Sequence, residues 1–444
     1  MTAKYHYDKT VETLRHKELK ALQWAKLEPL LHHVYKTNDF YRRHWDAAGV
    51  DLSKVTSFEA FSSLIPTVEK ADFLADQTAH PPQGTRLSNE IGPADRLEYY
   101  TTSGTSGQGS EIHIQTIREV AEMVKMYSYG FTWAGLKPGD LAVMTLPLTM
   151  MAGGRVEYDG GLGFGLTTLP IGNYEAKQKL SLIERFKPTV LYGSTTYFMH
   201  LAALAETDVK ESSIEVMLTG LEGGSIPYIE RLEEVWGAKA FDRFGSAQMR
   251  SDHMFTCERG FGTVEEPGVL HNIDPYAILE VLDLESGQQV SNGEYGEIII
   301  TSLYHQDVPL IRCQMRDGGI FRSGNSCSCG REMDGLQVCS IGRTDDVKKI
   351  KGVNVYPQAL DKTVFAIAEV DEYVVRLTSS SSQADIATIT AMMKSEIDES
   401  HGDRVRDQLG KDLHQNLGIH FEVIIGPVER SDYKTKRWID ERDR

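Results

Sequence analysis

The residues best suited to bind a ligand form a run of small polar side chains between positions 100 and 110. This stretch reads Tyr-Thr-Thr-Ser-Gly-Thr-Ser-Gly-Gln-Gly-Ser, with three glycines and six serine or threonine residues in eleven positions. Glycine lets successive backbone N–H groups turn toward a polyanion, and hydroxyl groups add donors to phosphate oxygens. Because the Gly-Lys-Ser/Thr spacing of a Walker loop is missing, the run predicts another kind of phosphate site, with a plain surface loop as the alternative.

A second group of residues has the composition of a metal site. Cys327 and Cys329 are separated by one residue in Cys-Ser-Cys-Gly-Arg, and Cys257 and His271 lie upstream. Three thiolates and one imidazole can hold Zn²⁺ in tetrahedral geometry, and four protein ligands leave no open position, so we expect a structural zinc. His253 is a competing ligand, and free thiols without a metal are the alternative. The two other cysteines are expected to be structural: Cys313 and Cys339.

Further motifs follow the polar run in order along the chain. They are Thr219-Gly-Leu-Glu-Gly, Phe241-Asp-Arg-Phe-Gly-Ser-Ala-Gln, Val308-Pro-Leu-Ile-Arg-Cys-Gln-Met-Arg-Asp, Gly342-Arg-Thr-Asp-Asp-Val, Ile350-Lys-Gly-Val-Asn-Val-Tyr-Pro and Arg430-Ser-Asp-Tyr-Lys-Thr-Lys-Arg-Trp-Ile-Asp. This ordered set resembles the adenylate-forming superfamily of acyl-CoA synthetases, peptide-synthetase adenylation domains and luciferases. The last two motifs, together with Leu30-Leu-His-His-Val-Tyr-Lys-Thr-Asn-Asp-Phe-Tyr-Arg-Arg, are similar to the phenylacetate–CoA ligase branch.

The resemblance implies a nucleotide site built from several of these motifs. The polar run would cradle the phosphates, the segment at 219–223 would pack on adenine, and Asp317 would accept hydrogen bonds from the ribose hydroxyls. Some relatives in the phenylacetate–CoA ligase branch carry a zinc of this kind. Its histidine ligand lies just before the strand that corresponds to 276–283. The implied ATP- and AMP-binding residues are Thr102, Ser103, Gly104, Thr105, Ser106, Gly107, Gly220, Glu222, Asp242, Phe244, Gly245, Ser246, Asp317 and Arg343.

Residues of the C-terminal part carry the remaining implied roles. Lys434 is the implied catalytic cation, which would bridge the substrate carboxylate and the α-phosphate; Lys436 is the less favoured neighbour. Without the resemblance, both would be ordinary solvated lysines. Asp345 and Asp346 mark the implied hinge about which the small domain rotates between half-reactions. The implied CoA tunnel is lined by Lys351 and Gly352.

Three residues depart from the family pattern. Gln248 stands where the family has a metal-binding glutamate; its amide oxygen can coordinate Mg²⁺ but carries no charge, so we expect weaker metal binding. Gly109 replaces the usual proline of the phosphate loop. Glu111 lies near the usual lysine or threonine position, where its charge would oppose a triphosphate unless the side chain faces away.

The acid-binding pocket is the part of the site that the sequence defines least. The family geometry would place parts of 127–133, 150–154 and 220–250 around the acyl group. Aromatic and methionine side chains there suit a flat or apolar acid, although they also suit an ordinary core.

The elements that must position these residues indicate an α/β fold. From 99 to 249, short apolar runs at 141–146, 189–192 and 214–219 alternate with helical patterns such as 197–205, which predicts largely parallel sheets. From 268 to 320 the pattern is β-rich, with strands at 277–282 and 296–302. The N-terminal 11–45 stretch is helical, with Pro29 expected to break or kink it.

The chain is expected to form two domains. A large N-terminal domain at 1–342 would bind ATP and acid, with mostly parallel sheets and a β-rich part. A small mobile α+β domain at 343–444 would carry the catalytic lysine. At 444 residues, the chain is too long for one ordinary core.

The composition of the chain limits the kinds of partner and the location that we expect. A net charge of −17 disfavours nucleic acid and anionic membranes. Five cysteines, an odd number, argue against a disulfide framework. No apolar run reaches the roughly 18 residues of a membrane span, and the first residues lack an apolar signal core, so we expect a cytoplasmic protein.

These observations predict an acid–thiol ligase that forms AMP. It would activate a carboxylic acid, expected to be aromatic, as an acyl-adenylate, using ATP and Mg²⁺, and pass the acyl group to CoA with release of AMP and pyrophosphate. The alternatives are transfer to a carrier-protein pantetheine or to an amine, and a degenerate homologue that only binds nucleotide. The sequence leaves open which acid is used and whether the chain acts alone or as a homodimer.

Overall fold

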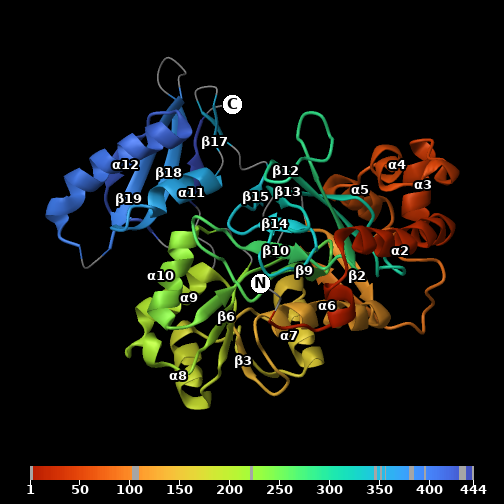
Figure 1. Ribbon diagram of the computed structural model, residues 1–444, viewed down its shortest axis with the longest axis horizontal. Helices are drawn as coiled ribbons and strands as arrows, with labels where there is room; N and C mark the ends of the chain where they lie inside the picture. The colour runs from red at the N-terminus through yellow and green to blue at the C-terminus, as the bar shows by residue number, and fades with distance from the viewer. Residues whose placement is uncertain are drawn as a thin grey trace.

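The computed structural model describes residues 4–102, 110–220, 224–344, 348–350, 353–355, 357–379, 385–394, 397–429 and 437–442. Within them the chain forms helices packed around several separate β-sheets (Figure 1). The expected α/β fold is confirmed, with a parallel sheet, antiparallel β parts and a small α+β part at the C-terminal end.

The N-terminal part is helical, as expected, but Pro29 does not interrupt it. The helix α2 continues from His16 to Thr37 with Pro29 inside. Loss of one hydrogen bond and the ring clash cost about 3 kcal/mol, whereas each fully buried leucine or valine contributes about 1.5–3 kcal/mol, and α2 buries several against the core. The expected break is therefore wrong. The other elements here are α1 (Lys9–Glu12), α3 (Asp39–Ala47), the 3₁₀ turn η1 (Leu52–Lys54), α4 (Phe58–Leu64) and α5 (Lys70–Ala79).

A five-stranded parallel sheet forms the first layer of the nucleotide-site region. Its strand order is β4-β3-β5-β6-β7, and the strands expected at 141–146, 189–192 and 214–219 are all present in it. The strands are β3 (Leu141–Met144), β4 (Thr167–Pro170), β5 (Val190–Tyr192), β6 (Val216–Leu218) and β7 (Lys239–Phe241). The helices between and beside them are α6 (Ile117–Trp133), α7 (Ala152–Phe164), α8 (Ala176–Phe186), α9 (Thr195–Leu204), the 3₁₀ turn η2 (Val209–Glu211) and α10 (Ile226–Trp236).

An antiparallel sheet of eight strands lies beside the parallel one. Its path is β11-β12-β13-β14-β10-β9-β8, and β15 pairs with β13 off this path. The two strands expected at 277–282 and 296–302 pair with each other in it. The strands are β8 (Arg243–Ser246), β9 (Ser251–Thr256), β10 (Val269–Asn272), β11 (Ala277–Leu282), β12 (Tyr295–Ser302), β13 (Cys313–Arg322), β14 (Gly335–Gln337) and β15 (Gly342–Arg343).

The C-terminal part is built on a mixed sheet with the order β20-β19-β18-β21. Two helices pack against each other beside this sheet, seen in blue in Figure 1. Thr378 and Ser379 end the strand β18 of this sheet. The elements are β18 (Val370–Ser379), β19 (Asp385–Met393), β20 (Glu422–Ile425), β21 (Trp438–Asp440), α11 (Pro357–Phe365), α12 (Gly402–Leu417) and the 3₁₀ turn η3 (Glu399–His401).

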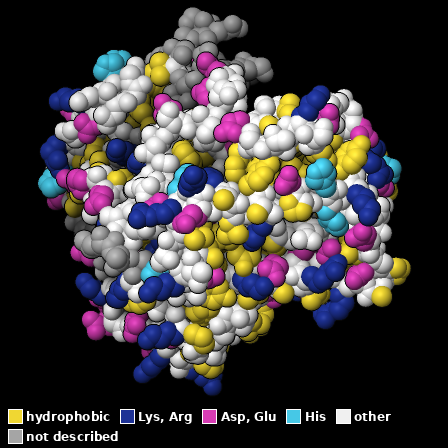
Figure 2. Space-filling model, turned by 45° about the vertical axis from the view of Figure 1, so that its right-hand side comes forward, with side chains coloured by type: hydrophobic (Ala, Val, Ile, Leu, Met, Phe, Trp, Pro, Cys, Tyr) yellow, Lys and Arg dark blue, Asp and Glu magenta, His cyan; other side chains and the backbone are white. Residues whose placement is uncertain are grey.

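Two small antiparallel pairs complete the described structure. The hairpin of β1 (Leu97–Thr101) and β2 (Ile112–Thr116) flanks the polar run, and β16 (Lys348–Ile350) pairs with β17 (Val353–Val355) just before the C-terminal sheet. Among the described residues, no helix has the length and apolar character needed to cross a membrane. Acidic and basic side chains are interspersed over the face shown in Figure 2.

Candidate active site and metal centre

The candidate nucleotide site lies where the parallel strands end. Thr219 and Gly220 follow β6, and Asp242 follows β7, so the motif residues gather at the carboxyl edge of the five-stranded sheet. In open α/β sheets this edge is where ligands bind, because loops from neighbouring strands meet there and leave a crevice. The backbone N–H of Thr219 and its hydroxyl both donate to the carbonyl of Phe241, at 2.8 and 3.0 Å, which ties the two loops together.

The two ends of the polar run are hydrogen-bonded to each other. The Thr102 N–H donates to the Glu111 carbonyl at 3.1 Å, and the Glu111 N–H donates to the Thr102 hydroxyl at 2.9 Å. The Thr101 N–H also donates to the Met150 carbonyl at 2.8 Å, which brings the start of α7 beside the run. The hairpin therefore fixes both stems of the expected phosphate loop.

Glu111 does not face a triphosphate freely; it is buried and surrounded by polar groups. The amide Nε2 of Gln248 donates to its two carboxylate oxygens at 3.2 and 3.1 Å. Nζ of Lys70 lies 3.8 Å from Oε2, and Nε2 of His113 lies 3.6 Å from Oε1. Burial by itself raises the pKa of Glu111, but His113, Lys70 and Gln248 together hold it below its ordinary value. Glu111 is thus a buried carboxylate whose nearest neighbours include the residue expected to bind metal.

His113 connects this cluster to a buried arginine. Burial lowers the pKa of His113 to about 4, so its ring is neutral at pH 7. Arg86 donates to Nδ1 of His113 at 2.8 Å, which leaves the proton on the Nε2 that faces Glu111. The geometry therefore orients a neutral imidazole between a cation and a carboxylate.

The motif at 241–248 runs along β8. Burial raises the pKa of Asp242 to about 7, and its carboxylate accepts from the Arg243 N–H at 3.0 Å. Ser246 accepts from the Met249 N–H at 3.0 Å. A Cβ at Gly245 would lie 2.2 Å from the Ser251 carbonyl oxygen, so only glycine permits this pairing with β9. Phe244 packs edge-on against His253 with ring centres 5.7 Å apart.

Asp317 and Arg343 lie opposite each other on neighbouring strands. They are partners in the register of β13 and β15, and Nη1 of Arg343 is 3.8 Å from Oδ1 of Asp317. The structure therefore brings the expected ribose ligand and the expected pre-hinge arginine together. Several other expected site residues lie outside the described part of the chain: Ser103, Gly104, Thr105, Ser106, Gly107, Glu222, Asp345, Asp346, Lys351, Gly352 and Lys434.

Sequence reasoning missed a buried ionic cluster centred on Arg243. Nη1 of Arg243 lies 2.6 Å from Oε1 of Glu157 on α7 and 2.8 Å from Oδ2 of Asp252 on β9. The hydroxyl of Tyr127 donates to the same Asp252 oxygen at 3.0 Å. Arg243 lies in the motif at 241–248. The feature of the sequence that could have revealed it is a charged residue between two apolar strand segments.

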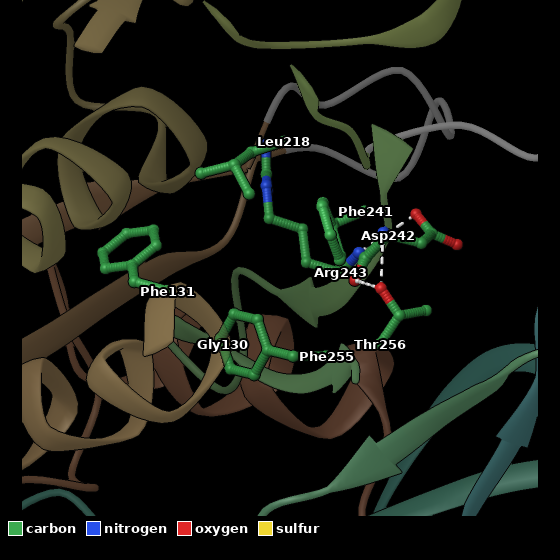
Figure 3. A pocket seen from close by; sticks show the side chains of 8 residues that line it. All are labelled: Gly130, Phe131, Leu218, Phe241, Asp242, Arg243, Phe255 and Thr256. Atoms are coloured by element: carbon green, nitrogen blue, oxygen red, sulfur yellow. Dashed lines mark hydrogen bonds between the residues drawn. The ribbon is translucent and has the colours of Figure 1, made fainter. Parts of the chain in front are cut away.

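A void of about 10 Å³, with room for about one water molecule, lies beside this arginine. Figure 3 shows Arg243 extended toward Leu218, while the carboxyl group of Asp242 points the other way. The pocket is lined by Gly130, Phe131, Leu218, Phe241, Asp242, Arg243, Phe255 and Thr256. Part of the expected acid-binding region at 127–133 and 220–250 thus meets in one place.

The four expected zinc ligands converge on one point. Their ligand atoms all lie within 4.8 Å of one another, and all four side chains are buried: Cys257, His271, Cys327 and Cys329. The Cys257 and Cys327 sulfurs are 3.8 Å apart, and the Cys329 sulfur is 3.6 Å from Nε2 of His271. Tetrahedral zinc with bonds of about 2.3 Å to sulfur and about 2.0 Å to nitrogen separates such ligand pairs by about 3.8 and 3.6 Å. The donor set and spacing therefore fit zinc.

The structure excludes the competing ligand and separates the other thiols. His253 is buried on β9 and packs on Phe244, outside the cluster. Cys313 and Cys339 are free thiols elsewhere in the core. No open coordination position is left by four protein ligands, which suits a structural rather than a catalytic ion.

The chain matches two family models. Residues 43–304 match the AMP-binding enzyme model, and residues 352–442 match the C-terminal domain of AMP-binding enzymes. Among curated proteins, the chain is similar to a phenylacetate–coenzyme A ligase of Thermus thermophilus, with 26% identity over 98% of this chain and 99% of the relative.

Solved structures share the whole fold. A 2-hydroxyisobutyryl-CoA ligase in the postadenylation state superposes with a TM-score of 0.88 at 22% identity, covering 97% of this chain and 91% of that one. The same ligase in the thioesterification state gives a TM-score of 0.70 at 22% identity, covering 99% and 94%. The family match spans more than half of the chain, and it agrees with the strand-end site described above. The chain therefore belongs to the adenylate-forming superfamily of AMP-binding enzymes and is an enzyme of its AMP-forming acid–CoA ligase family.

Proposed function

We propose that this ligase activates an aromatic carboxylic acid with ATP and transfers the acyl group to CoA. The observation that carries the proposal is the similarity to a phenylacetate–coenzyme A ligase along nearly the full length of both chains.

The chemistry requires two displacements. In the first, the substrate carboxylate attacks the α-phosphorus of ATP; a C–O–P bond forms and pyrophosphate leaves. In the second, the thiol of CoA loses its proton and its sulfur attacks the acyl carbon, so that AMP leaves with the electron pair of the broken bond. Activation is needed because an unactivated carboxylate would have to expel oxide, whereas AMP is a good leaving group.

The first displacement joins two anions, so it depends on cationic and N–H groups placed where charge develops. We assign this role to Lys434 and to the polar run from Thr102 to Gly107. Asp317 would hold the ribose, and Arg343 beside it would balance the carboxylate charge, given their 3.8 Å separation. We also propose that the two domains meet at 342–343 and that Asp345 and Asp346 form the hinge between them.

The expected magnesium position fits a metal poorly. Gln248 carries no charge, and its amide nitrogen donates hydrogen bonds to Glu111. Gln248 is therefore assigned no role as a magnesium ligand in the reaction. Zinc, bound by Cys257, His271, Cys327 and Cys329, would supply structural cross-linking only.

The test of adenylation is acid-dependent release of pyrophosphate from ATP, measured over a panel of aromatic acids. Lys434→Ala should lower the rate by at least about 100-fold, because transition-state charge loses its main cation. Lys436→Ala is the matched control and should retain the rate within a few-fold. Equal rates for the wild type and Lys434→Ala would remove Lys434 from the reaction.

The same panel of acids also shows which molecule accepts the acyl group. With CoA present, we expect a thioester to accumulate in step with AMP. An amide formed from an added amine, without a thioester on CoA, would contradict the transfer to CoA while leaving the adenylation intact. Absence of pyrophosphate release with every acid would contradict the activation step itself.

A further inference from the structure

Only one edge of the Arg243 guanidinium group, at Nη1, is paired with carboxylates. Nη1 lies beside Glu157 and Asp252, whereas Nε and Nη2 are buried and have no hydrogen-bond acceptor among the residues that the structure describes. The arginine side chain is only 3% exposed, so bulk solvent does not serve these donors. Buried polar groups are nearly always paired, and an unpaired one costs stability, so two unpaired donors on one group require an explanation.

The guanidinium is held rigidly between two surfaces. Its carbon Cζ lies 4.4 Å from the centre of the Tyr192 ring, which offers a cation–π contact. On another side is Gly220, where an added Cβ would lie 2.9 Å from Cγ and 3.1 Å from Cζ of Arg243. Gly220 therefore allows the backbone to approach the arginine closely, and the orientation of its unused edge is fixed by packing.

The cluster does not need a further cation or anion to balance it. Burial raises the pKa of Glu157 well above its ordinary value, although Arg243 opposes this shift. The two carboxylates beside Nη1 already offset the charge of the guanidinium group. What the cluster lacks is an acceptor for the two N–H groups, which point in parallel from the same edge as in side-on recognition of oxygen atoms.

The position of the arginine connects this edge to the acid. Arg243 lines the pocket with Phe131 and Phe255, and it touches Gly220, which begins the segment expected to pack on adenine. The reacting carboxylate must lie against the α-phosphate of the same nucleotide. An oxygen atom on the acyl group is small enough to enter the void beside Arg243, which has room for about one water molecule.

We infer that Arg243 is a specificity-determining residue whose free Nε and Nη2 edge binds an oxygen acceptor on the acyl group. The substrate class is thus an acid that carries a second oxygen-bearing group, such as a hydroxyl, a carbonyl or a carboxylate, rather than a bare hydrocarbon ring. This inference rests on the proposed function, since it refines the substrate of the same site.

Matched pairs of acids test the inference. The wild type is given para-hydroxyphenylacetate against para-methylphenylacetate, and para-carboxyphenylacetate against para-isopropylphenylacetate, and pyrophosphate release is measured for each. We expect the oxygen-bearing member of at least one pair to be preferred by roughly 10- to 100-fold, as for a hydrogen bond to a charged group. The pair that shows the preference identifies a hydroxyl or a carboxylate as the group bound. No preference in either pair would overturn the inference.

Two variants separate recognition from packing. Arg243→Lys keeps a cation for Glu157 and Asp252 but removes the paired edge, so the preference should fall by about tenfold or more. Arg312→Lys is the matched control, because Arg312 is also buried and paired, with Glu280, but its donors are satisfied within the protein. The control is expected to lose stability without a change in preference. An unchanged preference in Arg243→Lys would overturn the inference.

A third variant keeps the test valid if a single substitution at Arg243 prevents folding. Arg243→Met combined with Glu157→Gln and Asp252→Asn leaves no buried charge unpaired and should favour the apolar member of each pair. Calorimetric titration of the same acids into the full-length chain, without ATP, reads the preference even when no acid supports turnover. Loss of turnover alone would then count against the proposed function, whereas equal binding of paired acids would count against the role of Arg243.

Discussion

Because Glu111 and Gln248 are in contact, the effect of a substitution at either position depends on the residue at the other. Their separation along the chain is 137 residues, and the sequence suggested only that each departs from the family pattern. In the structure the two departures meet: the carboxylate of Glu111, near the family's usual lysine or threonine position, lies against the uncharged amide that stands where the family has a glutamate. An amide beside a buried carboxylate donates a hydrogen bond, whereas a second carboxylate would repel it.

Restoring the family residue at position 248 alone should therefore harm the protein. In Gln248→Glu, two carboxylates about 3 Å apart would share a buried site, so one must take up a proton and its pKa rises. We expect a loss of about 1–3 kcal/mol in the free energy of unfolding and no fall in the magnesium concentration needed for turnover. Thermal unfolding and a magnesium titration of pyrophosphate release measure both effects.

The double variant Glu111→Gln with Gln248→Glu is the matched control. It exchanges the two groups and keeps one carboxylate and one amide in contact, so stability should recover. It also places the charge at the family position, which should lower the magnesium requirement. A single Gln248→Glu variant as stable as the wild type would show that the contact with Glu111 does not constrain this position.

At the scale of elements, the cysteine and histidine cluster ties the loop between β13 and β14 to β9 and β10, which also pair with each other. Cys257 follows β9, His271 lies in β10, and Cys327 and Cys329 lie in the loop between β13 and β14. Arg331, at the end of that loop, is buried and ion-paired with Glu12 at 2.9 Å and with Glu258 at 2.8 Å. The loop thus anchors the N-terminal helix α1 as well as the sheet.

Loss of the metal should loosen this region first. Cys327→Ser is expected to abolish binding of about one zinc ion per chain and to lower the thermal unfolding temperature, because a coordinated ion stabilises only the folded arrangement. Elemental analysis and unfolding with and without a chelator measure the two effects. Cys313→Ser is the control, since that thiol is buried outside the cluster; it should keep its zinc. A wild-type protein without zinc would contradict the assignment.

At the scale of the whole molecule, the C-terminal part packs against α10 of the larger part. Arg231 on α10 and Asp371 on β18 form an ion pair at 2.7 Å, and the Tyr228 and Phe365 rings pack with centres 5.6 Å apart. Figure 1 shows α10 directly beside α11. Side-chain contacts of this kind can be exchanged for others, which a rotation between half-reactions requires.

Breaking the ion pair should shift the balance between domain arrangements. Asp371→Asn removes an attraction of at most about 1 kcal/mol, so we expect a change of up to about fivefold, with slower adenylation and faster transfer to CoA. Single-turnover measurements of the two half-reactions read these changes separately. Glu441→Gln is the control, because Glu441 pairs with Arg376 inside the C-terminal part; it should change neither rate. Equal effects on both half-reactions would contradict a role in rotation.

The sequence by itself determined the order and chemical type of the motifs. Glycine, serine and threonine at 101–107, aspartate at 317 and three cysteines with a histidine carry their chemistry in their residue types, so they could be recognised without a structure. The parallel strands were also predictable, since fully buried strands such as β5 are continuous apolar runs. Pro29 was misjudged, because its local cost is smaller than the gain from packing α2 on the core.

Only the tertiary structure decided which polar groups meet. It selected His271 over His253 as the metal ligand by bringing its Nε2 to within 3.6 Å of the Cys329 sulfur. It turned Gln248 toward Glu111, and it placed Arg243 between Glu157 and Asp252. Such contacts join residues from different helices and strands, and their energy depends on burial and distance, which the order of residues along a chain does not contain.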